Sequence, residues 1–184
     1  MTSPAPVELL AHPAIAASPF GPVCAEVAWR ADGGLQIEYR IADPGSQLSL
    51  PDPAPAAFTD GLWQHTCCEA FIAPAGSRAY REFNFAPNGA WAIYDFSDYR
   101  QRLATPPPSL APTIAVIATD NEFTLTATLP TALLPAADAW QLGLTVVLET
   151  VDGDKSWWAL THTEAQPDFH PLASFKLALN RPAP

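Results

Sequence analysis

The stretch YREFNFAPNGAWAIYDF, residues 80–96, decides the fold. Two aromatic-rich runs flank the sequence Pro-Asn-Gly at residues 87–89, and in the first run Phe83 and Phe85 alternate with Glu82 and Asn84. Side chains that alternate in this way point to opposite faces of a β-strand, and Pro, Asn and Gly are typical turn residues. The stretch therefore predicts a β-hairpin with one apolar face and one polar face.

The same period of two recurs on both sides of this hairpin. Leu35, Ile37, Tyr39 and Ile41 alternate with polar residues after an Asp-Gly-Gly turn, which indicates a half-buried strand. Further strands are expected at residues 23–29, 65–73, 113–119, 122–129, 141–151, 155–161 and 175–179. Residues 97–103 could form one or two helical turns. About ten short antiparallel strands with little helix predict an all-β sandwich of jelly-roll type, with residues 1–184 as one domain.

Composition supports this reading and narrows the partners. Of 184 residues, 48% are hydrophobic and only 15% are charged, which is typical of an ordered chain with a sizeable core. The 21 prolines disfavour long helices. A formal net charge of -10 argues against nucleic acid or an anionic membrane surface as a partner. No run approaches the roughly 20 apolar residues of a membrane helix.

The cysteines and the N-terminal residues bear on localisation. There are three cysteines, an odd number, and Cys67 and Cys68 are neighbours whose side chains should point to opposite faces of a strand. Adjacent cysteines of this kind are poor disulfide partners, so reduced thiols are expected. The first 20 residues lack the basic and continuous apolar segments of a secretion signal. Together these features predict a cytoplasmic protein.

Polar side chains gather on one face of two neighbouring predicted strands. His65, Cys67 and Glu69 share the polar face of the first strand, whereas Cys68, Ala70 and Ile72 should face the core; Tyr80, Glu82 and Asn84 share the polar face of the second strand. If these strands pair, Glu69 and Glu82 approach each other on one surface. The aromatic residues around this surface are Trp63, Tyr80, Trp157 and Trp158. Acids and amides bind sugar hydroxyl groups and indole rings stack on sugar rings, so a sugar pocket is one interpretation. The alternative is an ordinary solvated sheet face with tryptophans in the core.

Two longer stretches resemble a known family. The segment LWQHTCCEAFIAPAGSRAYREFNFAPNGAWAIYDFSDYR is similar to the central signature of DOMON-like domains related to family 9 carbohydrate-binding modules, and SWWALTHTEAQPDFHPLASF resembles a later loop of the same bacterial group. The resemblance implies a non-catalytic β-sandwich that binds a small ligand, either a soluble sugar or a haem. It implies stacking by Trp63 and by Trp157 or Trp158, and a polar clamp of Glu69, Glu82 and Asn84. His162 and His170 lie in the second stretch.

Three alternatives stay open from the sequence. A haem would need axial ligands, for which His65, His162 and His170 are candidates, because Met1 is the only methionine. A hydrolase could use Glu69 and Glu82 as an acid pair, or a metal held within HTEAQPDFH, residues 162–170. Calcium accompanies some members of the resembled family, and the DGD sequence at 152–154 offers oxygen ligands, although it is also a typical hairpin turn. The sequence demands neither calcium nor haem.

Overall fold

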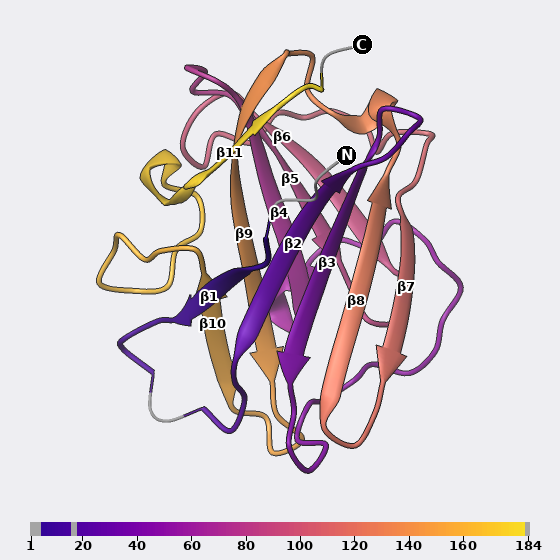
Figure 1. Cartoon of the computed structure of the whole chain (residues 1–184), viewed down its shortest axis with the longest axis vertical. Helices are drawn as coiled ribbons and strands as arrows, with labels where there is room; N and C mark the ends of the chain where they lie inside the picture. Colours follow the sequence, from indigo (N-terminus) through magenta and orange to yellow (C-terminus); the bar gives the residue numbers. More distant parts are fainter. Residues whose placement is uncertain (1–4, 16–17, 183–184) are drawn as a thin grey trace.

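A computed structural model describes residues 5–15 and 18–182, which fold into an all-β sandwich (Figure 1). Eleven strands lie within these residues, and helical geometry is confined there to three short 3-10 turns, Leu62–Gln64, Thr131–Leu133 and Leu172–Ser174. The strands are β1 (Val7–Ala11), β2 (Val23–Trp29), β3 (Leu35–Ala42), β4 (Cys67–Pro74), β5 (Tyr80–Phe85), β6 (Trp91–Phe96), β7 (Thr113–Ala118), β8 (Glu122–Leu129), β9 (Ala139–Glu149), β10 (Lys155–Ala159) and β11 (Leu177–Asn180). The predicted fold class is confirmed.

The strands form two facing layers. Each pair of neighbouring strands is antiparallel. One layer has the order β1-β2-β3-β8-β7 and the other β6-β5-β4-β9-β10, with β11 added along the first half of β9 (Figure 1). Strand β1 belongs to both layers, because Val7–Leu9 pairs with β2 whereas Leu10 and Ala11 pair with β10. The sequence patterns did not predict β1. Its five residues, VELLA, are too few to show a clear alternation of apolar and polar side chains.

The main core fills the space between the layers. The alternating apolar residues of β3 are fully buried there, in the same core cluster as Phe83 and Phe85 from β5 in the other layer. The buried hydroxyl group of Tyr39 on β3 donates a hydrogen bond of 2.7 Å to the main-chain oxygen of Glu69 on β4. This bond satisfies a buried polar group and ties the two layers together at the position of Glu69.

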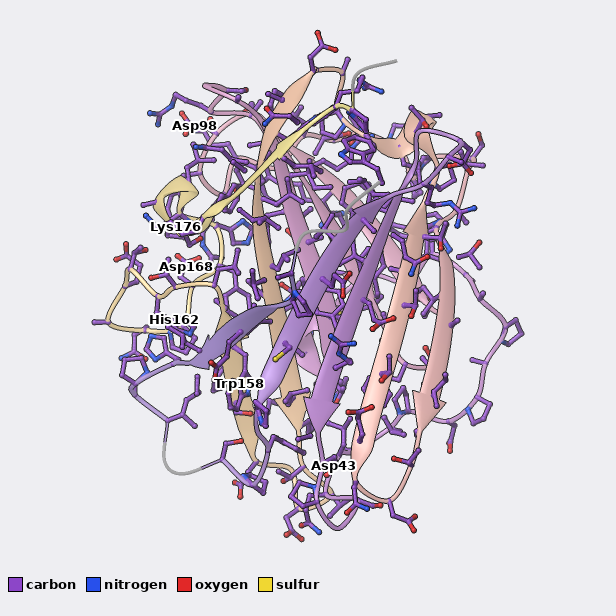
Figure 2. The ribbon with its side chains drawn as sticks, in the orientation of Figure 1. Asp43, Asp98, Trp158, His162, Asp168 and Lys176 are labelled. Carbon is purple, nitrogen blue, oxygen red and sulfur yellow. The ribbon has the colours of Figure 1, made fainter. Side chains whose placement is uncertain are left out.

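A second apolar cluster lies on the other face of the β6-β5-β4-β9-β10 layer, away from the main core. It contains Phe71 from β4, Tyr80 from β5 and Phe96 from β6, packed against Phe169 and Phe175 from the segment that follows β10. That segment, residues 160–176, runs along the outside of the layer and carries His162 and Asp168, both labelled in Figure 2. This face is therefore not open to solvent throughout, because loop residues cover part of it.

Residues 97–103 form a tight turn and an isolated bridge instead of the one or two helical turns that the sequence allowed. Arg100 adopts a left-handed backbone conformation, with φ 52°, which does not continue a right-handed helix. Arg102 then forms an antiparallel bridge with Phe96. This turn directs both arginines toward the covered face of the sheet. Within the described residues there is no helix long and apolar enough to cross a membrane.

Candidate functional site

The candidate site is built on β4 and β5, on the sheet face that points away from the main core. In the register of these strands Glu69 lies opposite Asn84 and Phe71 lies opposite Glu82. Glu69 and Glu82 thus occupy diagonal positions on one face, which are about 7–8 Å apart in antiparallel pairs. Both side chains are buried, with exposed fractions of 2% and 4%. The pairing expected from the sequence is confirmed.

Glu69 is the more deeply buried of the two acids. Its Oε2 atom accepts a hydrogen bond of 3.3 Å from the hydroxyl group of Thr145 on β9, whereas its Oε1 atom is buried without a hydrogen-bond partner. Burial raises the pKa of Glu69 well above its usual range, and the nearby charge of Glu82 adds to this effect. A buried polar atom without a partner is costly, so Glu69 Oε1 is an unsatisfied acceptor position in the free protein.

Glu82 is held by its neighbours on the sheet. Its Oε1 atom accepts a hydrogen bond of 2.6 Å from the amide of Asn84, and the Oδ1 atom of Asn84 accepts a weaker bond of 3.6 Å from the thiol of Cys67. Burial raises the pKa of Glu82 to about 7, while the Asn84 bond and the charges of Arg102 and Arg100 act in the opposite direction. Glu82 is therefore poised to exchange a proton near neutral pH.

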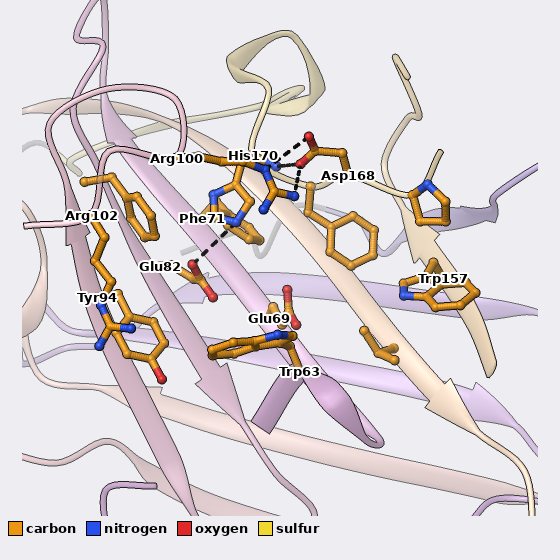
Figure 3. A pocket seen from close by; sticks show the side chains of 14 residues that line it. Trp63, Glu69, Phe71, Glu82, Tyr94, Arg100, Arg102, Trp157, Asp168 and His170 are labelled. Atoms are coloured by element: carbon orange, nitrogen blue, oxygen red, sulfur yellow. Dashed lines mark hydrogen bonds and ion pairs between the residues drawn. The ribbon is translucent and has the colours of Figure 1, made fainter. Parts of the chain in front are cut away.

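His170 faces Glu82 from the covering loop, with its Nε2 atom 4.0 Å from Glu82 Oε2 (Figure 3). Its Nδ1 atom lies 2.8 Å from the hydroxyl group of Tyr80, which also accepts a hydrogen bond of 3.2 Å from the main-chain nitrogen of Arg100. Because the Tyr80 hydroxyl group already accepts from Arg100, we infer that it donates its own proton to Nδ1. In this arrangement the proton of a neutral His170 is on Nε2, toward Glu82. Burial lowers the pKa of His170 to about 4, so the imidazole is neutral near pH 7.

An ion pair fixes the loop that carries His170. The guanidinium group of Arg100 contacts Asp168 at 2.9 Å, and the hydroxyl group of Tyr99 donates a second bond to the same carboxylate. Asp168 also accepts a bond of 3.0 Å from the main-chain nitrogen of His170. These bonds hold the pKa of Asp168 below its usual range against the effect of burial. Because one carboxylate joins the 97–103 turn to the loop, the position of His170 depends on Asp168.

Aromatic side chains form the walls of the site. Trp63, in the first 3-10 turn, is 41% exposed and contacts Tyr94 of β6 edge to face, with ring centres 5.9 Å apart. Arg102 lies over the Tyr94 ring at 3.8 Å and is 3.5 Å from Asp60, which also accepts a bond from the Tyr94 hydroxyl group. Trp157, half-buried on β10, lines the site from another strand (Figure 3).

These side chains enclose a pocket of about 350 Å³. That volume lies near the lower end of the ~300–1,000 Å³ of small-molecule sites. The lining residues are Trp63, Glu69, Phe71, Glu82, Tyr94, Phe96, Arg100, Arg102, Val147, Trp157, Pro167, Asp168, Phe169 and His170. Acidic groups on the floor and flat rings on the walls can take both hydrogen bonds and ring stacking from one small polar ligand.

Five of the residues expected from the sequence line this pocket together: Trp63, Glu69, Glu82, Trp157 and His170. Tyr80 and Asn84 lie behind the lining, where they hold His170 and Glu82 in place. The choice between the two neighbouring tryptophans is also resolved. Trp157 lines the pocket, whereas Trp158 is buried in the main core, with its indole nitrogen donating to Ser156.

His65 and His162 lie outside the pocket lining, contrary to expectation. Strand β4 begins at Cys67, and the exposed ring of His65, just before it, contacts Glu149 of β9 at 2.7 Å. His162 contacts the main-chain oxygen of Leu10 at 2.8 Å and packs against the ring of His12. The three candidate haem ligands are therefore not gathered in one place. Only His170 among them faces the pocket.

Several pocket residues were missed in the sequence. Tyr94 and Phe96 alternate on β6 and could have been assigned to this face from their expected pairing with Glu82 and Tyr80. Arg100 and Arg102 follow a turn whose shape no local pattern reveals. No group of three or more His, Cys, Asp or Glu side chains suited to a metal ion occurs in the part of the chain that the structure describes. The DGD sequence forms the turn between β9 and β10.

Comparisons with solved structures find the same fold at low identity. A family 9 carbohydrate-binding module from Caldicellulosiruptor kristjanssonii in complex with cellotriose has a TM-score of 0.61 and 11% identity over 92% of this chain and 80% of that one. A module of the same family and organism in complex with glucose has a TM-score of 0.55 and 12% identity over 83% and 73% of the two chains. A candidate carbohydrate-binding protein from Bacteroides uniformis gives a TM-score of 0.55 and 15% identity over 86% and 78%.

No known family and no curated protein is matched by the sequence itself. The fold implied by the resemblance to family 9 modules is thus confirmed at the level of three-dimensional structure. The relation to DOMON-like domains stays a prediction.

Proposed function

We propose that this domain binds a small carbohydrate in the pocket above Glu69 and Glu82. The observation that carries the proposal is the buried Oε1 atom of Glu69, which has no partner in the protein and belongs to a side chain lining a pocket with Trp63 and Trp157 as walls. A sugar hydroxyl group is a suitable donor to that oxygen, and the C–H face of a sugar ring suits an indole wall. The two structural neighbours that hold cellotriose and glucose support the proposal at the level of the fold.

The surrounding contacts fit a preformed binding site. Asn84 holds one oxygen of Glu82, and Tyr80 holds the ring of His170, so the polar atoms of the floor are oriented before any ligand arrives. Groups that are already ordered lose little entropy on binding, which favours affinity. As proposed here, the domain binds its sugar without changing it chemically.

Intrinsic tryptophan fluorescence tests the proposal directly. A panel of neutral mono- and disaccharides titrated into the protein should include at least one that changes the emission in a saturable way. Trp63→Ala should abolish most of this binding, because a stacking ring has no polar substitute. Trp29→Phe is the matched control, since Trp29 packs against Trp140, neither ring lines the pocket, and the change should leave affinity unchanged.

Glu69→Gln separates hydrogen bonding from stacking. An amide retains one acceptor, and a lost hydrogen bond to a charged group costs about 1.5–3 kcal/mol, so binding should weaken measurably without being abolished. If no sugar in a broad panel binds, or if Trp63→Ala binds as well as the wild type, the proposed function is wrong.

A further inference from the structure

The arginines around the pocket have ion-pair partners, whereas the two acids on its floor have none among the lysines and arginines of the described residues. Arg100 is paired with Asp168, and Arg102 with Asp60, so each guanidinium group at the rim already has its own carboxylate. Within the described residues, neither Glu69 nor Glu82 forms an ion pair with a lysine or an arginine. Among the described residues, the basic group within 4.0 Å of Glu82 is the imidazole of His170, whereas Arg100 and Arg102 act on Glu82 from a longer range and are already paired with Asp168 and Asp60.

That imidazole does not supply the missing positive charge. His170 is buried beside Tyr80, and its lowered pKa keeps it neutral at pH 7. Buried carboxylates are normally paired with a cation, because an isolated buried charge is costly. Glu69 and Glu82 have diagonal positions on one sheet face, and both arginines of the pocket are paired with other acids. The pocket floor is therefore short of positive charge whenever Glu69 or Glu82 is ionised.

The walls of the pocket suit a cation as well as a sugar ring. Trp63 and Trp157 line it, and indole is the aromatic ring that attracts cations most strongly. An ammonium group carries three N–H donors and no acceptor, which matches a floor where Glu69 Oε1 lacks a donor and Glu82 Oε2 has only the distant Nε2 atom of His170. A hydroxyl group satisfies the hydrogen bond but leaves the charge uncompensated.

We propose that the preferred ligand of this pocket is an amino sugar with a free, protonated amino group, whose ammonium group binds between Glu69 and Glu82. This inference rests on the proposed carbohydrate-binding function and specifies its ligand class. The sugar ring stacks on the indole walls, and the ammonium group donates to Glu69 Oε1. An N-acetylated sugar has no ammonium charge to compensate Glu69 and Glu82, so it should not bind more tightly than the neutral parent sugar.

Proton release on binding is a distinctive consequence. Burial raises the pKa of both acids in the free protein, and a bound ammonium group lowers it again by favouring the carboxylate forms. The groups facing Glu82 are Glu69, Asn84, His170, Arg100, Arg102 and Asp60, and those facing Glu69 are Thr145, Cys67 and Glu82. None of them is a free cation. Binding of an amino sugar near pH 6.5 should therefore release protons to the buffer, whereas binding of its neutral parent should not.

Isothermal titration calorimetry with matched sugars tests the proposal. The probes are glucosamine, galactosamine and mannosamine, each with its neutral parent and its N-acetyl derivative, titrated near pH 6.5 in two buffers of different ionisation enthalpy. At least one amino sugar should bind about tenfold more tightly than its parent, a difference of about 1.4 kcal/mol, and should release protons. Its N-acetyl derivative should bind no better than the parent.

Variants assign the effect to the two acids. Glu69→Gln and Glu82→Gln should each reduce the preference for the amino sugar to about threefold or less, while Asp138→Asn, at an exposed position, should leave it intact. Equal or tighter binding of the neutral parents would overturn the amino-sugar proposal and leave the carbohydrate-binding function standing. Binding of ethanolamine as tight as that of the best amino sugar would also overturn it. The absence of binding by every sugar would instead contradict the proposed function itself.

Discussion

Glu69 and Glu82 lie on diagonally adjacent positions of β4 and β5, both buried and both outside the main core. Asn84 and Phe71, their direct partners across the strands, complete the same face. Burial disfavours the ionised form of Glu69 and raises its pKa. The nearby charge of Glu82 raises this pKa further. The arrangement lowers the stability of the folded domain at neutral pH, which is a common property of binding sites.

Replacing Glu82 should make the domain more stable at high pH. The folded pKa of Glu82, about 7, exceeds its ordinary value of 4.5, so between these pH values the folded state holds a proton that the unfolded state releases. Protonated Glu82 makes its full contribution to the free energy of unfolding below about pH 4.5. That contribution is lost as the pH rises through about 7. Glu82→Gln should therefore be more stable than the wild type by on the order of 3 kcal/mol at pH 8.

Thermal unfolding followed by circular dichroism between pH 4 and pH 8 measures this difference. The melting temperature of Glu82→Gln should vary less with pH than that of the wild type, and the two proteins should be similar near pH 4. Asp138→Asn, a neutralising change at an exposed acid, serves as the control. A Glu82→Gln variant that is less stable than the wild type at pH 8 would show that the carboxylate is compensated.

Substitutions of Trp63 and Trp158 should have different effects, the first on sugar binding and the second on the stability of the fold. Trp63 is 41% exposed and lines the pocket, so Trp63→Ala should remove sugar binding with a loss of stability below about 1 kcal/mol. Trp158 is 8% exposed and packs in the main core, so Trp158→Ala should cost about 3–5 kcal/mol. Urea unfolding and ligand titration of both variants make the comparison; the opposite pattern would mean that Trp63 is a structural anchor.

His170 should be neutral, with its proton on Nε2, over most of the accessible pH range. Its pKa of about 4 follows first from burial, and Tyr80 fixes the tautomer by donating to Nδ1. Nitrogen-15 chemical shifts of the imidazole should show the Nε2–H form from pH 8 down to about pH 5. Tyr80→Phe should remove the tautomer preference while His65, which is exposed, stays unchanged. Titration of His170 near its ordinary value of about 6.5 would contradict this contact scheme.

The three cysteines should all be reduced and differ in reactivity. Cys24, Cys67 and Cys68 are free thiols, and burial raises the pKa of Cys67 and Cys68 well above the usual range. Thiolates are the reactive form, so only the partly exposed Cys24 should react quickly in the native protein. Under denaturing, non-reducing conditions a thiol reagent should detect all three. Detection of a single thiol would reveal a disulfide.

The sequence predicts the floor of the site better than its walls. Period-two alternation on β4 and β5 is enough to assign Glu69, Glu82 and Asn84 to one face, because register on a half-buried sheet follows the apolar residues. The same argument could not choose between Trp157 and Trp158, since the choice depends on the pairing of Trp158 with the core residue Val146.

The rest of the site depends on contacts between residues distant in sequence. Arg100 reaches the pocket because its backbone is left-handed and because Asp168, far along the chain, binds its guanidinium group. Neither property has a local signature. The same holds for His65. The strand begins only at Cys67, after the 3-10 turn at Leu62–Gln64, and the exposed His65 ring contacts Glu149 outside the pocket lining.

The carbohydrate site is tested most directly by a crystal structure of the domain with the tightest-binding sugar from the titrations. We expect a sugar ring against Trp63 or Trp157, with a hydroxyl or ammonium group within hydrogen-bond distance of Glu69 Oε1, the buried atom that has no partner in the protein. A sugar bound elsewhere on the surface, with the pocket above Glu69 and Glu82 occupied only by water, would contradict it.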